Sequence, residues 1–328
     1  MRVCIVGAGA VGGHLAGRLA AGGADVSVVA RGPALDAIRA NGLRVEATDW
    51  AFKGRLSGAE SDPARLGLQD VVLVTVKAPA IPEVAPTLMP LLGKDTDVIF
   101  ICNGVPWWYF GDADSELART ARARLDPHGR IAATIGLKRT VGGVIYSACQ
   151  VEEPGVVRVR SPVNRLILGK PDGGSAPSLQ AVSDVLSAGG MTVEISSNIR
   201  KVVWDKLVVN MGSGLISILT QRATGHIYSD PVAADLVRGV SEEVASIARA
   251  MGENVHSDAE TRISYGRNSK HRVSMLQDLD SGRQMEIDAQ CVVPLEIATQ
   301  LGLKLPLLNV LVPLVRMRAE EAGLYSRL

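Results

Sequence analysis

A glycine-rich segment near the N-terminus has the spacing of a dinucleotide-binding loop. The segment has the pattern G-x-G-x-x-G and lies directly after an apolar run and before a helix-like stretch. Its residues are Gly7, Ala8, Gly9, Ala10, Val11 and Gly12. In such a loop the first glycine permits a tight turn, the second lets the backbone approach a pyrophosphate, and the third lets helix and strand pack closely. The helix N-terminus adds free N–H groups and a partial positive charge. The context favours a cofactor loop over a purely structural glycine cluster.

The residue after the second expected strand discriminates between the two nicotinamide dinucleotides. An NAD site has an acidic residue there to bind the ribose 2′-hydroxyl. This chain has Arg31 instead. Its planar guanidinium can make charge-assisted hydrogen bonds to a 2′-phosphate. The alternative is a surface arginine in a loop, but the missing carboxylate and the guanidinium together favour NADP, used as NADPH.

Two polar residues follow later strand-like runs. Lys77 comes after Val71–Val76, and Asn103 comes after Val98–Cys102. Ligands of open parallel sheets bind beyond the carboxyl ends of the strands, so both residues are candidates to face the cofactor. Polar residues are also common in such loops without any function, and the sequence leaves both interpretations open.

The C-terminal half contains two groups of residues that could do chemistry. Lys206 and Asn210 are four apart and share one helical face, beside an apolar stripe that would pack. Ser274 and Asp278 share another face, and Glu286 follows beyond Gly282, which predicts a break in the helix. A solvated, charged helix surface is the alternative for both groups.

The elements that must position these residues change in kind along the chain. Strand-like runs alternate with helix-like stretches in the first half, which predicts a parallel sheet covered on both faces. We expect strands at 3–6, 26–29, 71–76 and 98–102, a helix at 81–92, a half-exposed hairpin within 42–56, and a strand-rich stretch at 131–168. Beyond residue 198 the pattern is helical. The sequence therefore predicts an α/β domain at 1–197 and an all-helical substrate domain at 198–328.

Composition narrows the class of protein. The chain has 328 residues with 35 basic and 34 acidic side chains, a net charge of +1. This balance gives no electrostatic footprint for nucleic acid or an anionic membrane. The four cysteines are scattered and the five histidines dispersed, so we expect reduced thiols and no metal site. Without an expected signal peptide or membrane span, we expect a cytoplasmic protein.

The residues together resemble the ketopantoate reductase family, the NADPH-dependent 2-dehydropantoate 2-reductases of pantothenate and coenzyme A biosynthesis. The resemblance extends over nearly the whole chain. It is carried by the glycine loop, Arg31, Lys77, Asn103-Gly104, Pro154-Gly155-Val156-Val157, Trp204-Asp205-Lys206-Leu207 with Asn210, and Ser274-Met275-Leu276-Gln277-Asp278 with Glu286-Ile287-Asp288. It implies a doubly wound, mainly parallel Rossmann domain followed by a helical domain. Monomers and dimers are both compatible with it, and we expect a homodimer.

The resemblance also implies roles for individual residues. Lys206 would be the general acid that protonates the developing alkoxide, and Glu286 would hold the lysine or a substrate hydroxyl. Asn103, Asn210 and Ser274 would bind a small 2-oxo acid. The glycine loop, Arg31, Lys77 and Asn103 would bind NADPH.

Two segments depart from the family pattern. Gly214 stands where the family usually has a second asparagine. The run Trp107-Trp108-Tyr109-Phe110 places four of the twelve aromatic residues beside Asn103. That run is either a core plug or a pocket wall for another, bulkier 2-oxo acid, so the exact substrate stays open.

Overall fold

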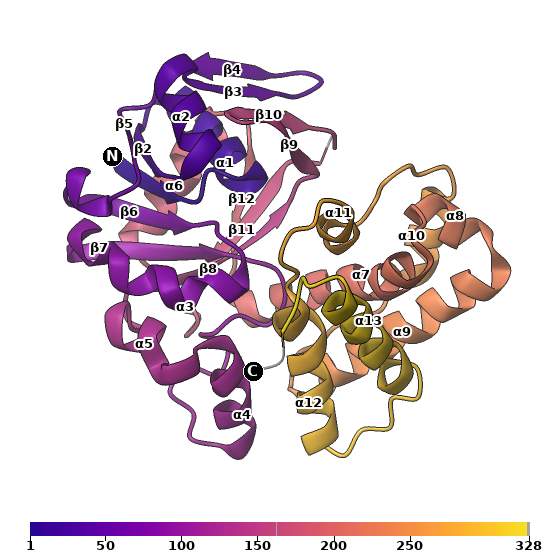
Figure 1. Cartoon of the computed structure of the whole chain (residues 1–328). Coiled ribbons are helices and arrows are strands. Elements are labelled where there is room, and N and C mark those ends of the chain that lie inside the picture. The colour runs from indigo at the N-terminus through magenta and orange to yellow at the C-terminus, as the bar shows by residue number, and fades with distance from the viewer. Residues whose placement is uncertain (162, 327–328) are drawn as a thin grey trace. The chain divides into compact units, whose positions relative to one another are not determined.

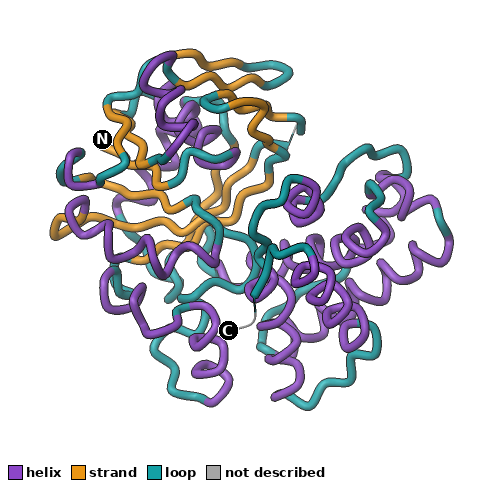
Figure 2. The backbone as a smooth tube through the Cα atoms, in the orientation of Figure 1, coloured by secondary structure: helices purple, strands orange, loops and turns teal. Residues whose placement is uncertain are grey.

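The computed structural model describes residues 1–161 and 163–326 and divides into two compact units. The first comprises 1–102 and 129–199, and the second comprises 103–128 and 200–328. A single division after residue 197 would leave 103–128 with the first unit. Within the part of the chain that the structure describes, all strands belong to the first unit, as the orange segments of Figure 2 show.

The first unit is built on an eight-stranded sheet in the order β12-β11-β8-β7-β6-β1-β2-β5. Its strands are β1 (Arg2–Val6), β2 (Asp25–Val29), β5 (Gly58–Glu60), β6 (Gln69–Val74), β7 (Leu92–Ile101), β8 (Thr140–Tyr146), β11 (Arg165–Gly169) and β12 (Thr192–Ile195). All neighbouring pairs are parallel except β8 and β11. The chain moves outward from β1 in both directions, so the order reverses between β1 and β6. This is the topological switch point at which such sheets bind ligands.

Helices cover both faces of this sheet (Figure 1). They are α1 (Ala10–Ala21), α2 (Gly32–Asn41), α3 (Ile81–Val84), α5 (Arg130–Thr134) and α6 (Pro177–Ala188), with 3₁₀ turns η1 (Pro63–Arg65), η2 (Ala78–Ala80) and η3 (Ala85–Leu91). A further turn, η4 (Pro127–Gly129), lies where the chain passes from the second unit back to the first. The single helix expected over 81–92 is an α-helical turn followed by a 3₁₀ segment, because prolines at 82, 86 and 90 remove backbone donors. The strand-rich stretch expected from 131 begins with a short helix instead, and its first strand begins at Thr140.

A second, four-stranded sheet packs on α1. It has the order β4-β3-β10-β9, formed by β3 (Leu43–Glu46), β4 (Ala51–Gly54), β9 (Cys149–Glu153) and β10 (Val156–Val159). The antiparallel β3–β4 pair confirms the expected hairpin. A Cβ on Gly13 would lie 2.7 Å from Val157, and one on Gly17 would lie 2.7 Å from Val45. Close packing against this sheet therefore accounts for the two small residues on α1.

The second unit is helical. It contains α4 (Glu116–Leu125), α7 (Ile199–Thr220), α8 (Thr224–Ser229), α9 (Pro231–Ala250), α10 (Ala259–Gly266), α11 (Ser274–Asp280), the π-helical segment η5 (Asp288–Val292), α12 (Val293–Gln300) and α13 (Leu308–Glu321). The segment 103–128 joins it because α4 packs on α12, where the Arg124 guanidinium donates to both Glu296 carboxylate oxygens. By length and hydropathy, α7 could cross a membrane, but 72% of its apolar window is buried within the protein, as in a core helix.

Candidate functional site

The glycine loop joins β1 to α1 in the sheet unit, and its shape depends on glycine at two positions. Gly7 has φ of +102°, a left-handed conformation that side chains strain. A Cβ on Gly12 would lie 1.9 Å from the Gly7 carbonyl oxygen. Thr75, the residue after β6, fixes the turn, since its hydroxyl donates to the carbonyl of Gly7 at 2.8 Å. By contrast, a Cβ on Gly9 would meet no atom within 4 Å, which leaves space for a ligand against the backbone.

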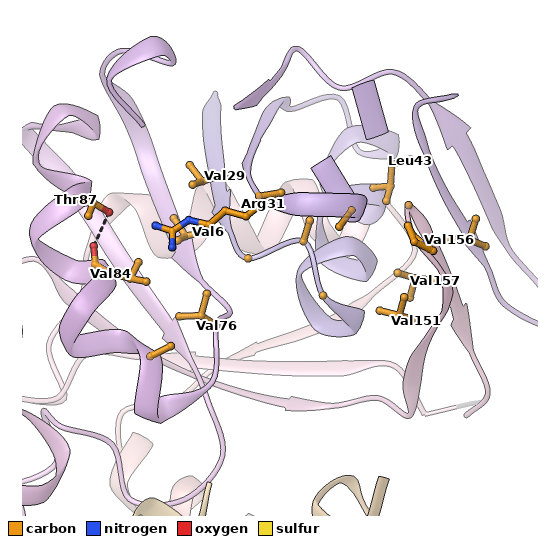
Figure 3. A pocket seen from close by; sticks show the side chains of 18 residues that line it. Val6, Val29, Arg31, Leu43, Val76, Val84, Thr87, Val151, Val156 and Val157 are labelled. Carbon is orange, nitrogen blue, oxygen red and sulfur yellow. Dashed lines mark hydrogen bonds between the residues drawn. The ribbon is translucent and has the colours of Figure 1, made fainter. Parts of the chain in front are cut away.

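A pocket of about 470 Å³ opens beside this loop, at the switch point. Its lining is mostly apolar: Val6, Gly7, Ala8, Gly9, Val29, Ala30, Arg31, Ala34, Leu43, Val76, Ala80, Val84, Thr87, Val151, Pro154, Gly155, Val156 and Val157. Figure 3 shows the Arg31 side chain reaching across it toward Val84 and Thr87. An apolar cavity with one cation and a helix N-terminus fits a dinucleotide with a phosphorylated ribose. The lining also includes residues 154–157, which form the β9–β10 turn and the start of β10 in the second sheet.

Lys77 lies one residue beyond the pocket-lining Val76. It is half-buried and directly precedes the 3₁₀ turn η2. The structure thus keeps Lys77 in the sheet unit, at the carboxyl side of β6. Asn103, which follows β7 in the sequence, belongs to the helical unit instead.

The helical unit gathers three of the predicted site residues into one hydrogen-bonded cluster. The Asn103 side-chain amide donates to Glu286 Oε2 at 3.1 Å. Gln290 Nε2 donates to the same oxygen at 3.2 Å, and Gln290 Oε1 accepts from Asn210 Nδ2 at 3.1 Å. Glu286 is only 4% exposed, so its carboxylate depends on such donors in place of water. Asn103, Glu286 and Asn210 are far apart in sequence and lie within one hydrogen-bonded network.

Two backbone features bring this cluster together. The chain after Asp280 turns at Ser281–Gly282, which confirms the expected break, and Glu286 directly precedes the helical segment that contains η5. Gly104 has φ of +85°, and a Cβ there would lie 2.3 Å from the Ala289 carbonyl oxygen. The Val105 N–H donates to that carbonyl at 2.8 Å. Asn103 is therefore fixed against the π-helical turn that bears Gln290.

Lys206 and Ser274 occupy neighbouring elements of the same unit. Lys206 lies one turn before Asn210 on α7 and is half-buried, while Val203, Leu207 and Met211 of the apolar stripe are buried, as the spacing predicts. Ser274 is exposed at the first residue of α11. The next residue, Met275, packs near Gly214, with 3.9 Å between its Cε and a Cβ built on the glycine. The α11 helix therefore packs against α7.

Several residues that brace this cluster carry little signal in the sequence. Gln290 is fully buried, and its only sequence signal is an amide inside the apolar run Ala289–Val293. On one side of Glu286, the Met285 N–H donates to the Leu324 carbonyl at 3.0 Å. On the other side, the Tyr325 hydroxyl donates to Asp288 Oδ1 at 2.8 Å. The end of the chain thus holds both flanks of the Glu286 segment.

Asp288 is a charged residue that makes two of the contacts around the Glu286 segment. Arg124 Nη1 lies 3.3 Å from its Oδ1, in addition to the Tyr325 contact. Burial raises the pKa of Asp288, and the Tyr325 hydrogen bond and the Arg124 charge partly oppose this rise. The ion pair therefore stabilises the carboxylate form in a half-buried position.

The aromatic run after Asn103 packs inside the helical unit. Trp107, Trp108 and Tyr109 are 6%, 1% and 2% exposed. The Trp204 indole N–H donates to the Tyr109 hydroxyl at 2.6 Å, and the two rings meet edge to face. Burial raises the pKa of the Tyr109 phenol. The burial of these side chains favours the core plug over the pocket wall.

The glycine loop at the switch point and the all-helical second unit define a Rossmann-type dinucleotide-binding protein. The family model described as ketopantoate reductase PanE/ApbA matches residues 3–173, and its C-terminal counterpart matches residues 198–319. The chain belongs to the ketopantoate reductase family, which confirms the resemblance.

Individual relatives agree over the full length. A 2-dehydropantoate 2-reductase from Mesorhizobium japonicum is 36% identical over 99% of this chain and 100% of its own. A structure from Ralstonia solanacearum MolK2, provisionally assigned as a ketopantoate reductase, is 38% identical with a TM-score of 0.88, covering 99% of each chain. A D-mandelate dehydrogenase solved with NADH and anilino(oxo)acetate has a TM-score of 0.81 at 19% identity, covering 98% of this chain and 100% of that one. The last similarity concerns the fold alone.

Proposed function

We propose that this protein reduces 2-dehydropantoate to pantoate with NADPH in the cytoplasm, as a step of pantothenate and coenzyme A biosynthesis. The observation that carries the proposal is the hydrogen-bonded Asn103–Glu286–Gln290–Asn210 network, in the same unit as Lys206. Asn103, Asn210 and Glu286 are side chains that the family pattern assigns to a 2-oxo acid and its proton donor, and Gln290 links two of them. The full-length relative named for this reaction supports the same substrate.

The choice of NADPH rests on the sheet unit. Arg31 is the one arginine or lysine among the residues that line its described pocket, and the end of β2 bears no carboxylate that would repel a phosphate. The backbone around Gly9 would receive the pyrophosphate at the N-terminus of α1. Lys77 and Asn103 would complete the contacts to the nicotinamide end.

The residues of the helical unit account for the proton chemistry. NADPH, when bound, supplies the hydride that reduces the 2-oxo carbon. Lys206 donates its ammonium proton to the oxygen that becomes negative, which stabilises that charge and completes the hydroxyl. Glu286 keeps the ammonium charged and oriented, while Asn103, Asn210 and Ser274 bind the substrate.

A steady-state assay of NADPH and NADH oxidation tests the proposal. We would compare 2-dehydropantoate with a smaller aliphatic 2-oxo acid and an aromatic one. The expected result is the highest kcat/KM for 2-dehydropantoate with NADPH. A higher kcat/KM for the aromatic acid would show that 2-dehydropantoate is not the preferred substrate. A higher kcat/KM with NADH would show that NADPH is not the preferred cofactor.

A further inference from the structure

Gln290 connects two residues of the proposed site that belong to different elements. It lies in η5 and has no exposed surface. One end of its amide contacts Glu286, and the other contacts Asn210 on α7. A buried amide is costly unless both ends are hydrogen-bonded, and here both ends are used on site residues.

The chemistry of the groups fixes the direction of each bond. An ionised carboxylate only accepts hydrogen bonds, so Gln290 must present its NH₂ to Glu286. Its carbonyl oxygen then faces α7, and Asn210 must present its own NH₂ to that oxygen. The Asn103 amide is oriented by the same carboxylate. The charge of Glu286 thus sets the orientation of Asn210 through Gln290, although Asn210 and Glu286 have no bond to each other among those described.

We infer that Gln290 is a positioning residue that aligns the Glu286 carboxylate and turns the carbonyl oxygen of Asn210, a hydrogen-bond acceptor, toward the hydroxyl group of the bound 2-dehydropantoate. This inference rests on the proposed function, which places Glu286 and Asn210 at the substrate. Gln290 acts through these two side chains. Because one amide serves both, a change at Gln290 alters two parts of the site together.

Two substitutions separate the two contacts. Gln290→Leu keeps a similar volume and removes both hydrogen bonds. Gln290→Glu keeps an acceptor for Asn210 but places a carboxylate against Glu286. Cys291→Ala is the matched control, because Cys291 is the next residue of the same π-helical segment and is equally buried.

The two Gln290 variants should differ in how their losses are distributed between kcat and the KM for the 2-oxo acid. Gln290→Leu should lower kcat/KM for the 2-oxo acid by roughly 5- to 100-fold, the range for a buried partner left unsatisfied. Both kcat and the KM for the acid should change, with the KM for NADPH unchanged. Gln290→Glu should lower kcat while the KM for the acid stays close to that of the parent enzyme. Cys291→Ala should retain both values.

A double-mutant cycle tests whether Gln290 acts through Asn210. If it does, the loss in Gln290→Leu/Asn210→Ala should be smaller than the product of the two single losses, since each single change already breaks the shared contact. The inference would be overturned if the double variant lost activity by the product of the two single losses and if Gln290→Leu had the same kcat and KM as Cys291→Ala. Gln290 would then be a packing residue.

A spectroscopic measurement separates this inference from the choice of substrate. The Asn210 side-chain NH₂ signals, assigned by their absence in Asn210→Ala, should exchange slowly with solvent in the parent enzyme and rapidly in Gln290→Leu. Failure of the parent enzyme to reduce 2-dehydropantoate would refute the proposed function but would not alter this result. Equal exchange in both proteins would refute the positioning role whatever the substrate.

Discussion

The candidate sites of the two units differ in the groups that would contact a ligand, which are backbone groups in one unit and side chains in the other. In the sheet unit, the proposed binding surface is the backbone of six consecutive residues, the loop 7–9 and the first turn of α1, and a single side chain, Arg31, is proposed to add specificity. In the helical unit, the cluster consists of side chains from positions 103, 210, 286 and 290, and the backbone serves to hold them. A site made of backbone is encoded locally, whereas a site made of converging side chains exists only after the unit folds.

Buried polar groups differ between the units in the same way. In the sheet unit, His14 and Arg18 are buried on α1, and Arg18 donates to the carbonyls of Gly189 and Gly190 and stacks on Trp50 at 3.7 Å. These contacts join α1 to the segment after α6 and serve packing. In the helical unit, the buried Glu286 and Gln290 converge on the candidate site. Substitutions should therefore affect mainly stability in the first case and mainly activity in the second.

The largest expected effect is on catalysis by the helical unit. Lys206→Ala should lower kcat by about 10²- to 10⁴-fold, the range for a lost general acid. NADPH affinity should change little, because most of the proposed cofactor contacts lie in the sheet unit. Lys201→Ala, which breaks an ion pair with Asp205 on the same helix, is the control and should stay active. A folded Lys206→Ala enzyme with normal kcat would remove the lysine from the mechanism.

The next effect concerns the aromatic core of the helical unit. Trp108→Ala should destabilise the protein by about 3 to 5 kcal/mol, as large core truncations do. Thermal unfolding measures this loss, and the half-buried Phe110 gives a milder comparison as Phe110→Ala. The relative kcat/KM values across 2-oxo acids should stay the same. A changed ranking of the substrates would instead indicate that the aromatic run forms a wall of the substrate pocket.

A pH effect should appear in the sheet unit. Burial, and secondarily the Arg18 charge, lowers the pKa of His14 to about 4. The unfolded chain binds a proton at His14 below about pH 6.5 and the folded chain does not, so stability falls as the pH decreases from 6.5 toward 4. The loss should reach about 2 to 3 kcal/mol, measured by urea unfolding at each pH. His14→Gln should flatten this slope, whereas His226→Gln, at an exposed site, should keep it.

The smallest expected effect is on cofactor choice. Arg31→Ala should reduce the preference for NADPH over NADH by about 10- to 150-fold, because one charged hydrogen-bond partner of the 2′-phosphate is lost. Direct titration with both dinucleotides measures it. Arg65→Ala changes an exposed arginine of the same unit that lies 3.7 Å from Glu60, and it should leave the preference intact. Equal weakening of both cofactors would argue against the phosphate contact.

The sequence determined the features that depend on near neighbours. Strand and helix periodicity predicted the parallel sheet and the helical second half, and glycine spacing located the loop at the switch point. Helical spacing placed Lys206 and Asn210 on one face and predicted the break near Gly282. These features follow from backbone conformation and the apolar pattern over a few residues.

Tertiary structure decided the rest. That 103–128 joins the helical unit depends on α4 packing against α12, a contact between segments about 170 residues apart. In the sequence, Gln290 is one polar residue within an apolar run. Its role becomes visible only in the folded unit, where Asn210 and Glu286 contact the two ends of its amide. The brace from Leu324 and Tyr325 likewise closes a loop of nearly forty residues. Such contacts form only when packing of the whole unit offsets the entropy of loop closure, and no local pattern records that balance.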